Sequence, residues 1–103
     1  MKMIAVTACP AGVAHTHMAA AALEASAKKM GLKIKVEKQG AMGIENAIKE
    51  KEVSEAEALI LAVDTAIAKS DRFNNIPTIK VSVAEAVKNP QGLINQAIEL
   101  AKK

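Results

Sequence analysis

The sequence has 103 residues and a formal net charge of +3. Half of its residues are hydrophobic, and Phe73 is the only Phe, Tyr or Trp among them. This length suits a single domain with one core filled by aliphatic side chains. The lysines are scattered, and no basic stripe is interleaved with aromatic residues, which argues against a nucleic-acid-binding protein. No apolar run approaches the roughly 20 residues of a membrane-spanning helix, so we expect no direct membrane insertion.

Cysteine usage and the first residues indicate the compartment. Cys9 is the only cysteine, which excludes an internal disulfide and a Cys-x-x-Cys redox pair. Residues 1–6 contain one lysine and an apolar run that is too short for a secretory signal. We therefore expect a cytosolic protein, because a lone thiol stays reduced in that compartment.

The first half of the chain alternates between strand and helix patterns. The apolar, partly β-branched residues 4–8 predict a buried parallel strand, and residues 16–30, which are rich in good helix formers, predict a helix that Gly31 ends. Alternating apolar and charged residues over 32–38 predict a strand with one wet face, and a loop is expected over 39–43.

The middle of the chain contains the most apolar segment. A short helix is predicted over residues 45–49, and Ser54 is expected to cap a further turn over 55–57. The continuous apolar run 58–63 predicts the central strand. Residues 66–75 show no clear periodicity, so no element is assigned there.

The last part of the chain predicts one more strand and two helices. Residues 78–81 are typical of a strand, and a helical stretch begins at Ser82 or Val83. Asn89 is expected to cap a final helix with Pro90 at its first position, and the lysines at the end of the chain complement the helix dipole.

The alternation of strands and helices predicts an α/β fold. We expect one domain over residues 1–103, built on an open sheet of four mostly parallel strands flanked by helices. Sites in such folds form beyond the carboxyl ends of the strands, and Cys9, Gln39, Gly40 and Asp64 all fall at such ends.

The turn after the first strand has the composition of an anion-binding loop. Main-chain N–H groups before a helix converge on anions, and the helix dipole favours a thiolate at the same place. Gly12 lets the backbone curl, and His15 can donate a hydrogen bond to a bound anion. Thr16 can cap the helix or offer its hydroxyl to the sulfur. The predicted phosphate-binding loop after Cys9 consists of Pro10, Ala11, Gly12, Val13, Ala14, His15 and Thr16.

The interval from Cys9 to His15 and Thr16 matches that of the loop Cys-x5-Arg-Ser/Thr in cysteine phosphatases of low molecular weight. His15 stands here in the place of the arginine that clamps the transition state, which disfavours hydrolysis of a stable phosphate ester. We therefore interpret Cys9 as a phosphoryl carrier. A phosphatase and a non-catalytic thiol sensor, regulated through oxidation of Cys9, are the alternatives.

The loop and several later segments resemble a known family. The core Cys-Pro-x-Gly-x-Ala-His-Thr resembles the active loop of fructose-family (fructose-like) enzyme IIB, a component of the bacterial phosphoenolpyruvate-dependent sugar phosphotransferase system. The resemblance covers nearly the whole chain in the right order, over residues 5–20, 36–40, 43–46, 56–64 and 71–73.

This resemblance implies that residues 1–103 form a single fructose-like IIB domain. Cys9 would accept phosphate from a phosphohistidine on the IIA partner and pass it to fructose or a fructose-like sugar in the membrane-embedded IIC partner. The implied location is cytoplasmic, peripheral to the inner membrane through IIC. No cofactor or metal is expected, because the sequence has neither a nucleotide-binding motif nor a zinc-ligand spacing.

Four positions away from the loop are secondary site residues. Gln39 and Gly40 belong to a Gly-x-x-Gly stretch that is either a second anion-binding turn or an ordinary loop. Asp64 is expected to cap the end of a strand or to act near the cysteine. Arg72 is either a solvated charge or a contact for the acidic surface of a partner.

Overall fold

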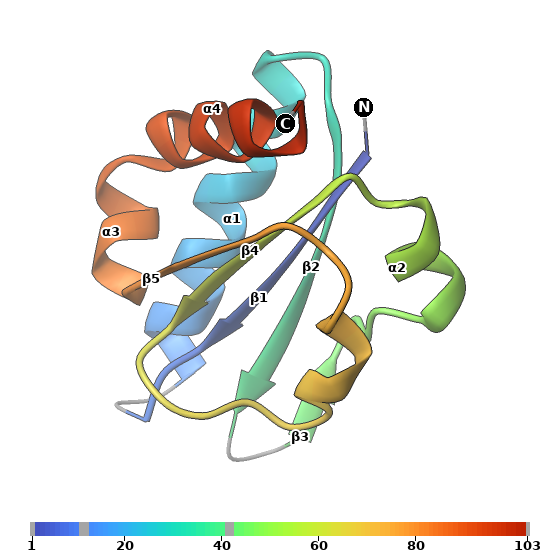
Figure 1. Ribbon diagram of the computed structural model, residues 1–103. Helices are drawn as coiled ribbons and strands as arrows, with labels where there is room; N and C mark the ends of the chain where they lie inside the picture. The colour runs from blue at the N-terminus through green and yellow to red at the C-terminus, as the bar shows by residue number, and fades with distance from the viewer. Residues whose placement is uncertain (1, 11–12, 41–42, 103) are drawn as a thin grey trace.

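The computed structural model describes residues 2–10, 13–40 and 43–102. Its strands are β1 (Lys2–Ala8), β2 (Lys33–Gly40), β3 (Gly43–Glu45), β4 (Ala58–Val63) and β5 (Thr78–Val81). Its helices are α1 (Val13–Lys29), α2 (Glu50–Glu55), the 3-10 helix η1 (Ser70–Phe73), α3 (Val83–Lys88) and α4 (Pro90–Ala101). The strands form one sheet, with α1, α3 and α4 on one face and α2 and η1 on the other (Figure 1).

The sheet has the order β3-β2-β1-β4-β5. β1 pairs in parallel with β2 and with β4, and β4 pairs in parallel with β5, whereas β3 is antiparallel to β2. The predicted α/β fold with an open, mostly parallel sheet is therefore confirmed. The expected strand number of four is wrong: Gly40 pairs with Gly43 inside the segment predicted as a loop, and Gly43 has a φ of 114° that favours glycine.

The helix predicted over residues 45–49 is not present. Asn46 has a φ of 56°, in the left-handed region, and the helix α2 begins only after Lys49. A carboxylate oxygen of Glu52 accepts a hydrogen bond from the Lys49 N–H at 2.8 Å, which fixes the start of α2. Ser54 lies inside α2, where its hydroxyl donates to the Lys51 carbonyl at 2.7 Å, so it caps no later turn.

The two carboxyl-terminal helices begin where the sequence predicts. The Ser82 hydroxyl accepts a hydrogen bond from the Glu85 N–H at 3.1 Å at the start of α3. The Asn89 side chain accepts one from the Gly92 N–H at 3.2 Å, and Pro90 is the first residue of α4. Both caps satisfy N–H groups that have no partner within their own helix.

Apolar side chains fill both faces of the sheet. The cluster beneath α1, α3 and α4 includes Met3, Ala5, Leu23, Val36, Ile60, Leu93 and Ile94. The smaller cluster beneath α2 and η1 includes Ile4, Val6, Ile48, Leu59, Val63 and Phe73. The alanines Ala19, Ala20 and Ala27 of α1 are fully buried, so this long helix packs closely on the sheet.

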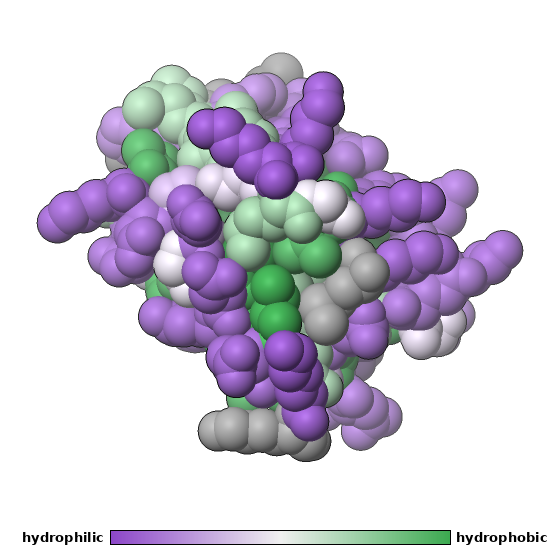
Figure 2. All heavy atoms as spheres, turned by 90° about the horizontal axis from the view of Figure 1, so that it is seen from above, coloured by the Kyte–Doolittle hydropathy of each residue, from purple (hydrophilic) through white to green (hydrophobic). Residues whose placement is uncertain are grey.

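The parallel strands all end at one edge of the molecule, and both chain ends lie at the opposite edge (Figure 1). Figure 2 shows the edge with the chain ends, where hydrophilic side chains surround a short apolar strip. None of the helices in the described ranges combines the length and the hydropathy that crossing a membrane requires.

Candidate functional site

The strand order creates a crevice at the carboxyl ends of β1 and β4. The chain passes from β1 to β2 on one side and later returns to β4 on the other side of β1. The connections after β1 and β4 therefore leave in opposite directions, and open α/β sheets bind their ligands at such a switch point. Cys9 directly follows β1, and Asp64 directly follows β4.

The thiol of Cys9 is half-buried and opens into a hollow of about 460 Å³ between α1 and α3. The hollow is lined by Cys9, His15, Met18, Asp64, Val83, Ala84, Val87 and Lys88. Met18 is 53% exposed and is the one large exposed hydrophobic side chain within the described ranges. The Cys9 sulfur thus sits at the edge of an open and mainly apolar surface.

Helix α1 begins at Val13, a few residues after Cys9. Because α1 begins at Val13, the main-chain N–H groups of Val13, Ala14 and His15 have no partner within the helix. The positive end of the helix dipole lies at the same place. Pro10 lies exposed in the turn, and Ala11 and Gly12 lie outside the described residues, so their part in the loop stays a prediction.

Thr16 has a different position from the one that the sequence predicts. It lies inside α1 and is therefore not the N-cap. Its hydroxyl is buried and, like that of Thr7, has no hydrogen-bond partner among the described residues. Thr16 lines a small second hollow of about 40 Å³, which it shares with His17, Lys38, Gln39, Gly40, Gly43 and Glu45. His15 and Thr16 therefore face different hollows, and only His15 shares one with Cys9.

His17 links α1 to the edge of the sheet. Its Nε2 lies 3.1 Å from a carboxylate oxygen of Glu45 in β3. The side chain of His17 is 47% exposed.

Asp64 is held at the site by two hydrogen bonds. Its N–H donates to the carbonyl of Ala8 at 2.9 Å, and its Oδ1 accepts from the Val83 N–H at 3.2 Å. It therefore ties the end of β1 to the start of α3 while lining the same hollow as Cys9. Asp64 thus lies at the end of its strand and beside the cysteine, and the expected role toward Cys9 stays a prediction.

The sequence places Glu37 on the wet face of its strand, and this is wrong. The side chain is fully buried, and its carboxylate accepts two hydrogen bonds from the guanidinium of Arg72, from Nη1 at 2.8 Å and from Nη2 at 2.9 Å. The Ile48 N–H and the Gln39 Nε2 each donate a further hydrogen bond at 2.7 Å. Four donors thus surround a carboxylate that strand periodicity alone assigns to solvent.

Arg72 is engaged throughout its length and is neither a solvated charge nor free to meet a partner. Its side chain is 15% exposed, and its guanidinium also donates to the carbonyls of Lys69 and Ile48, each at 2.8 Å. The guanidinium lies 4.5 Å from the ring centre of Phe73, within the range of a cation–π contact. The sequence signal for this role is that Arg72 is the only arginine in the chain.

Gln39 fastens the segment after β4 to the end of β2. Its Oε1 accepts from the Ala68 N–H at 2.9 Å, and its Nε2 donates to the Ala68 carbonyl at 3.2 Å. Among the residues singled out from the sequence, the structure thus groups Cys9, His15 and Asp64 in one hollow. It places Gln39 and Arg72 in a separate network around Glu37.

The hydrogen bonds around Glu37 determine its protonation. Burial by itself raises the pKa of this carboxyl, but the hydrogen bonds from Arg72, Gln39 and the Ile48 N–H, with the charge of Arg72, lower the pKa below its usual value of 4.5. The side chain is therefore an anion in the folded protein at neutral pH.

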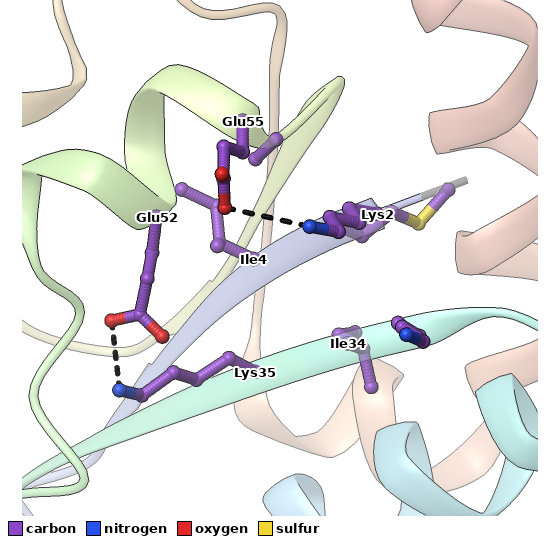
Figure 3. Close-up of a pocket in the computed structure, with 9 residues that line it drawn as sticks. Lys2, Ile4, Ile34, Lys35, Glu52 and Glu55 are labelled. Atoms are coloured by element: carbon purple, nitrogen blue, oxygen red, sulfur yellow. Dashed lines mark hydrogen bonds and ion pairs between the residues drawn. The ribbon is translucent and has the colours of Figure 1, made fainter.

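A further hollow, of about 200 Å³, lies at the opposite end of the sheet (Figure 3). Lys2 meets Glu55 at 3.4 Å across it, and Lys35 meets Glu52 at 2.8 Å. These pairs match each carboxylate with an ammonium group, and no cysteine, serine or threonine is among the residues that line the hollow. Over the described part of the chain, no three His, Cys, Asp or Glu side chains gather in a way that suits a metal ion.

The fold and the position of Cys9 define a class of protein: an α/β domain with a cysteine between its first strand and the start of the following helix. A family model described as "PTS system, Lactose/Cellobiose specific IIB subunit" matches residues 4–96. The chain belongs to this IIB family of the sugar phosphotransferase system, whose members are phosphoryl-transfer components. The predicted resemblance is therefore confirmed at the level of the family.

Two relatives differ in how much of their length the chain matches. The fructose-like EIIB component 2 of Escherichia coli strain K12 is 44% identical over 95 residues, which are 92% of this chain and 90% of that protein. The 2-O-alpha-mannosyl-D-glycerate-specific EIIABC component of the same organism is 47% identical over 100 residues, which are 97% of this chain. The chain spans only 15% of the length of that second relative.

A solved structure shows the same fold. A crystallised domain of the fructose-specific IIABC component of Borrelia burgdorferi superposes with a TM-score of 0.90 at 47% identity. The match covers 95% of this chain and 93% of that one.

The buried ion pair yields the first prediction. Replacing Arg72 with Ala leaves the Glu37 carboxylate buried without its cation, and breaking such a pair costs about 3–5 kcal/mol of unfolding free energy. Urea unfolding followed by circular dichroism measures this loss. The matched control is Lys35→Ala, which breaks a pair whose side chains are 27% and 30% exposed and which we expect to cost about 1 kcal/mol or less. Equal losses in the two variants would contradict the assignment.

The second prediction concerns acid pH. Because the pKa of Glu37 is lowered in the folded state, the stabilisation is present above 4.5 and is lost as the pH falls through the folded value. The variant Glu37→Gln lacks this titration. We expect the wild type to be the more stable of the two at neutral pH and the gap in unfolding free energy to narrow below pH 4.5. A gap that stays constant with pH would show that the carboxylate has no special stabilisation.

Proposed function

We propose that this chain is a phosphoryl carrier whose acceptor is Cys9. The phosphoryl group comes from a phosphohistidine on a IIA partner and passes to a sugar held by a membrane-embedded IIC partner. The observation that carries the proposal is the position of Cys9 between the end of β1 and the start of α1, a helix whose first N–H groups have no intrahelical partner. Membership of the IIB family supplies the reaction class.

The first step is an in-line displacement at phosphorus. The sulfur of Cys9 attacks as the thiolate, the P–S bond forms, and the P–N bond to the donor imidazole breaks. The imidazole nitrogen that leaves takes up a proton, which replaces the one that the thiol released. The N–H groups of Val13, Ala14 and His15 are the donors available to the three phosphoryl oxygens.

In the second step the sulfur, which is the nucleophile in the first step, becomes the leaving group. A sugar hydroxyl attacks phosphorus on the side opposite to the sulfur, the P–S bond breaks, and the hydroxyl proton is released to a base. The apolar lining around Cys9, which includes Met18, Val83 and Val87, suits a partner surface that covers the site. Such a cover excludes water and so protects the phosphocysteine from hydrolysis.

The engagement of Arg72 argues against a phosphatase. A cysteine phosphatase of this loop type needs an arginine to clamp the transition state, and the single arginine of this sequence is bound to Glu37. Without that clamp, the loop suits the transfer of a phosphoryl group from an energetic donor better than the hydrolysis of a stable ester.

Fructose or a fructose-like sugar is the substrate that we propose. The relative that the chain matches over 90% of its length is named as a fructose-like EIIB component. A second relative is named for mannosylglycerate, and the family description names lactose and cellobiose. The sugar site itself would lie on IIC, so the surface of this chain selects its protein partners and not the sugar.

We further propose that residues 1–103 act as one fructose-like IIB domain at the cytoplasmic side of IIC. The single sheet and its two apolar clusters support one folded unit. The fused relatives that are named EIIABC components support a working arrangement with IIA and IIC.

The third prediction tests this function. Incubation with phosphoenolpyruvate, the general phosphotransferase proteins and a IIA protein should add one phosphoryl group to Cys9, which mass spectrometry of the intact protein and its peptides locates. Iodine should cleave the bond, as expected for a P–S linkage. The variant Cys9→Ser should keep its fold and lose the label, because its hydroxyl is a much weaker nucleophile than a thiolate.

The matched control is Thr65→Ala, which removes an exposed hydroxyl at the same edge of the sheet and should leave the labelling unchanged. Label that persists in Cys9→Ser, or that maps to another residue, would refute the assignment. Steady hydrolysis of an aryl phosphate by the isolated chain, lost with Cys9, would favour a phosphatase.

A further inference from the structure

Cys9 and Asp64 are neighbours across the sheet. Ala8 pairs with Val63 at the end of the ladder between β1 and β4, and the Asp64 N–H continues that ladder by donating to the Ala8 carbonyl at 2.9 Å. The next two residues, Cys9 and Asp64, therefore stand side by side, about 5 Å apart in the backbone. Residues in matching register on parallel strands direct their side chains to the same face.

The side chains of both residues line the same hollow. Its other charged or titratable lining residues are His15 and Lys88. Among the described residues, no Lys, Arg or His nitrogen lies within ion-pair distance of Asp64. The hydrogen bond from the Val83 N–H holds the carboxylate in place at the start of α3. A fixed negative charge without an ionic partner in that part of the chain thus stands beside the nucleophilic sulfur.

We propose that Asp64 raises the free energy of the phosphocysteine by electrostatic repulsion. This inference rests on the proposed function. When the phosphoryl group moves from the donor imidazole to Cys9, a neutral thiol becomes a thiophosphate dianion, and the thiol proton ends on the imidazole nitrogen. The N–H groups of α1 attract this new charge, and the Asp64 carboxylate repels it.

The size of the effect follows from Coulomb's law. A dianion and a carboxylate about 6 Å apart in water repel each other enough to shift an equilibrium by about tenfold. The anion-binding loop alone would hold the phosphoryl group tightly and slow its release to a sugar hydroxyl. Repulsion from Asp64 weakens this binding, so the phosphocysteine remains an energetic phosphoryl donor. Asp64 acts as a positioning and electrostatic residue and takes no proton in the reaction.

The test uses Asp64→Asn, whose amide oxygen can still accept the hydrogen bond from the Val83 N–H. Cys9 is alkylated in parallel with iodoacetate, which is an anion, and with iodoacetamide, which is neutral. The thiolate fraction and the accessibility of the sulfur affect both rates equally and drop out of their ratio. The ratio therefore reports the local electrostatic potential at the sulfur. At low ionic strength we expect Asp64→Asn to raise the iodoacetate to iodoacetamide ratio about threefold, and high salt to reduce the change.

The matched control is Glu24→Gln, which removes the same charge from an exposed position late in α1. Its ratio should change much less than that of Asp64→Asn, because the charge lies farther along α1 from Cys9 and Coulomb repulsion weakens with distance. A ratio that is unchanged in Asp64→Asn, or that changes equally in both variants, overturns the inference. A loss of the Val83 hydrogen bond alone lowers the melting temperature without changing the ratio. If Asp64→Asn does not fold, Asp64→Ser keeps an acceptor and allows the same measurement.

A second measurement separates this inference from the proposed function. Phosphoryl exchange between phosphorylated IIA and this chain is brought to equilibrium, and the fraction of phosphorylated Cys9 is measured. Asp64→Asn should shift the equilibrium about tenfold toward phosphocysteine. If the wild type and Asp64→Asn both become labelled and reach the same fraction of phosphorylated Cys9, the role of Asp64 is overturned and the carrier function stands. A wild-type protein that accepts no phosphoryl group refutes the carrier function instead.

Discussion

The unpaired N–H groups at the start of α1 are the feature on which the account of this protein depends. Every α-helix has such groups, and they are stabilised by water, by caps or by an anion. Here the parallel pairing of β1 with β2 and β4 carries the chain to a switch point of the sheet and places Cys9 a short turn before the start of α1. In the proposed function, the start of this helix is an anion site and Cys9 is its nucleophile, and the rest of the fold holds the two in place.

Opposed charges at this site suit a carrier better than a hydrolase. A carrier must accept a phosphoryl group, protect it from water and release it, so it needs neither the tightest anion site nor a clamping arginine. In the proposed carrier, the N–H groups of α1 attract the phosphoryl group, a partner covers the apolar hollow, and Asp64 supplies a counteracting negative charge. Arg72 is withheld from the loop by Glu37 and serves the scaffold instead.

The sequence predicts the local elements better than the long-range contacts. The caps at Ser82 and Asn89 and the apolar strands 4–8 and 58–63 carry their signals within a few residues, and the structure contains them. The burial of Glu37 has no local signal, because its partner Arg72 lies far away in sequence. The strand β3 is not predicted because Gly-rich hairpins have the composition of loops. The helix α1 begins at Val13 and not at Thr16, where the run of good helix formers begins. For the site, the sequence identifies Cys9, His15 and Asp64 as residues of interest. The register of β1 and β4 places Cys9 beside Asp64, and the first turn of α1 brings His15 to the same hollow.

The most direct test of the central claim follows the amide resonances of the isotopically labelled protein before and after phosphorylation. If the helix start holds the phosphoryl group, the amide protons of Val13, Ala14 and His15 should show the largest downfield shifts, because hydrogen bonds to an anion deshield them. The amides of α4, across the molecule, should stay in place and serve as the internal reference. Phosphorylation that leaves the three amides unmoved, or that moves those of α4 more, would contradict the claim.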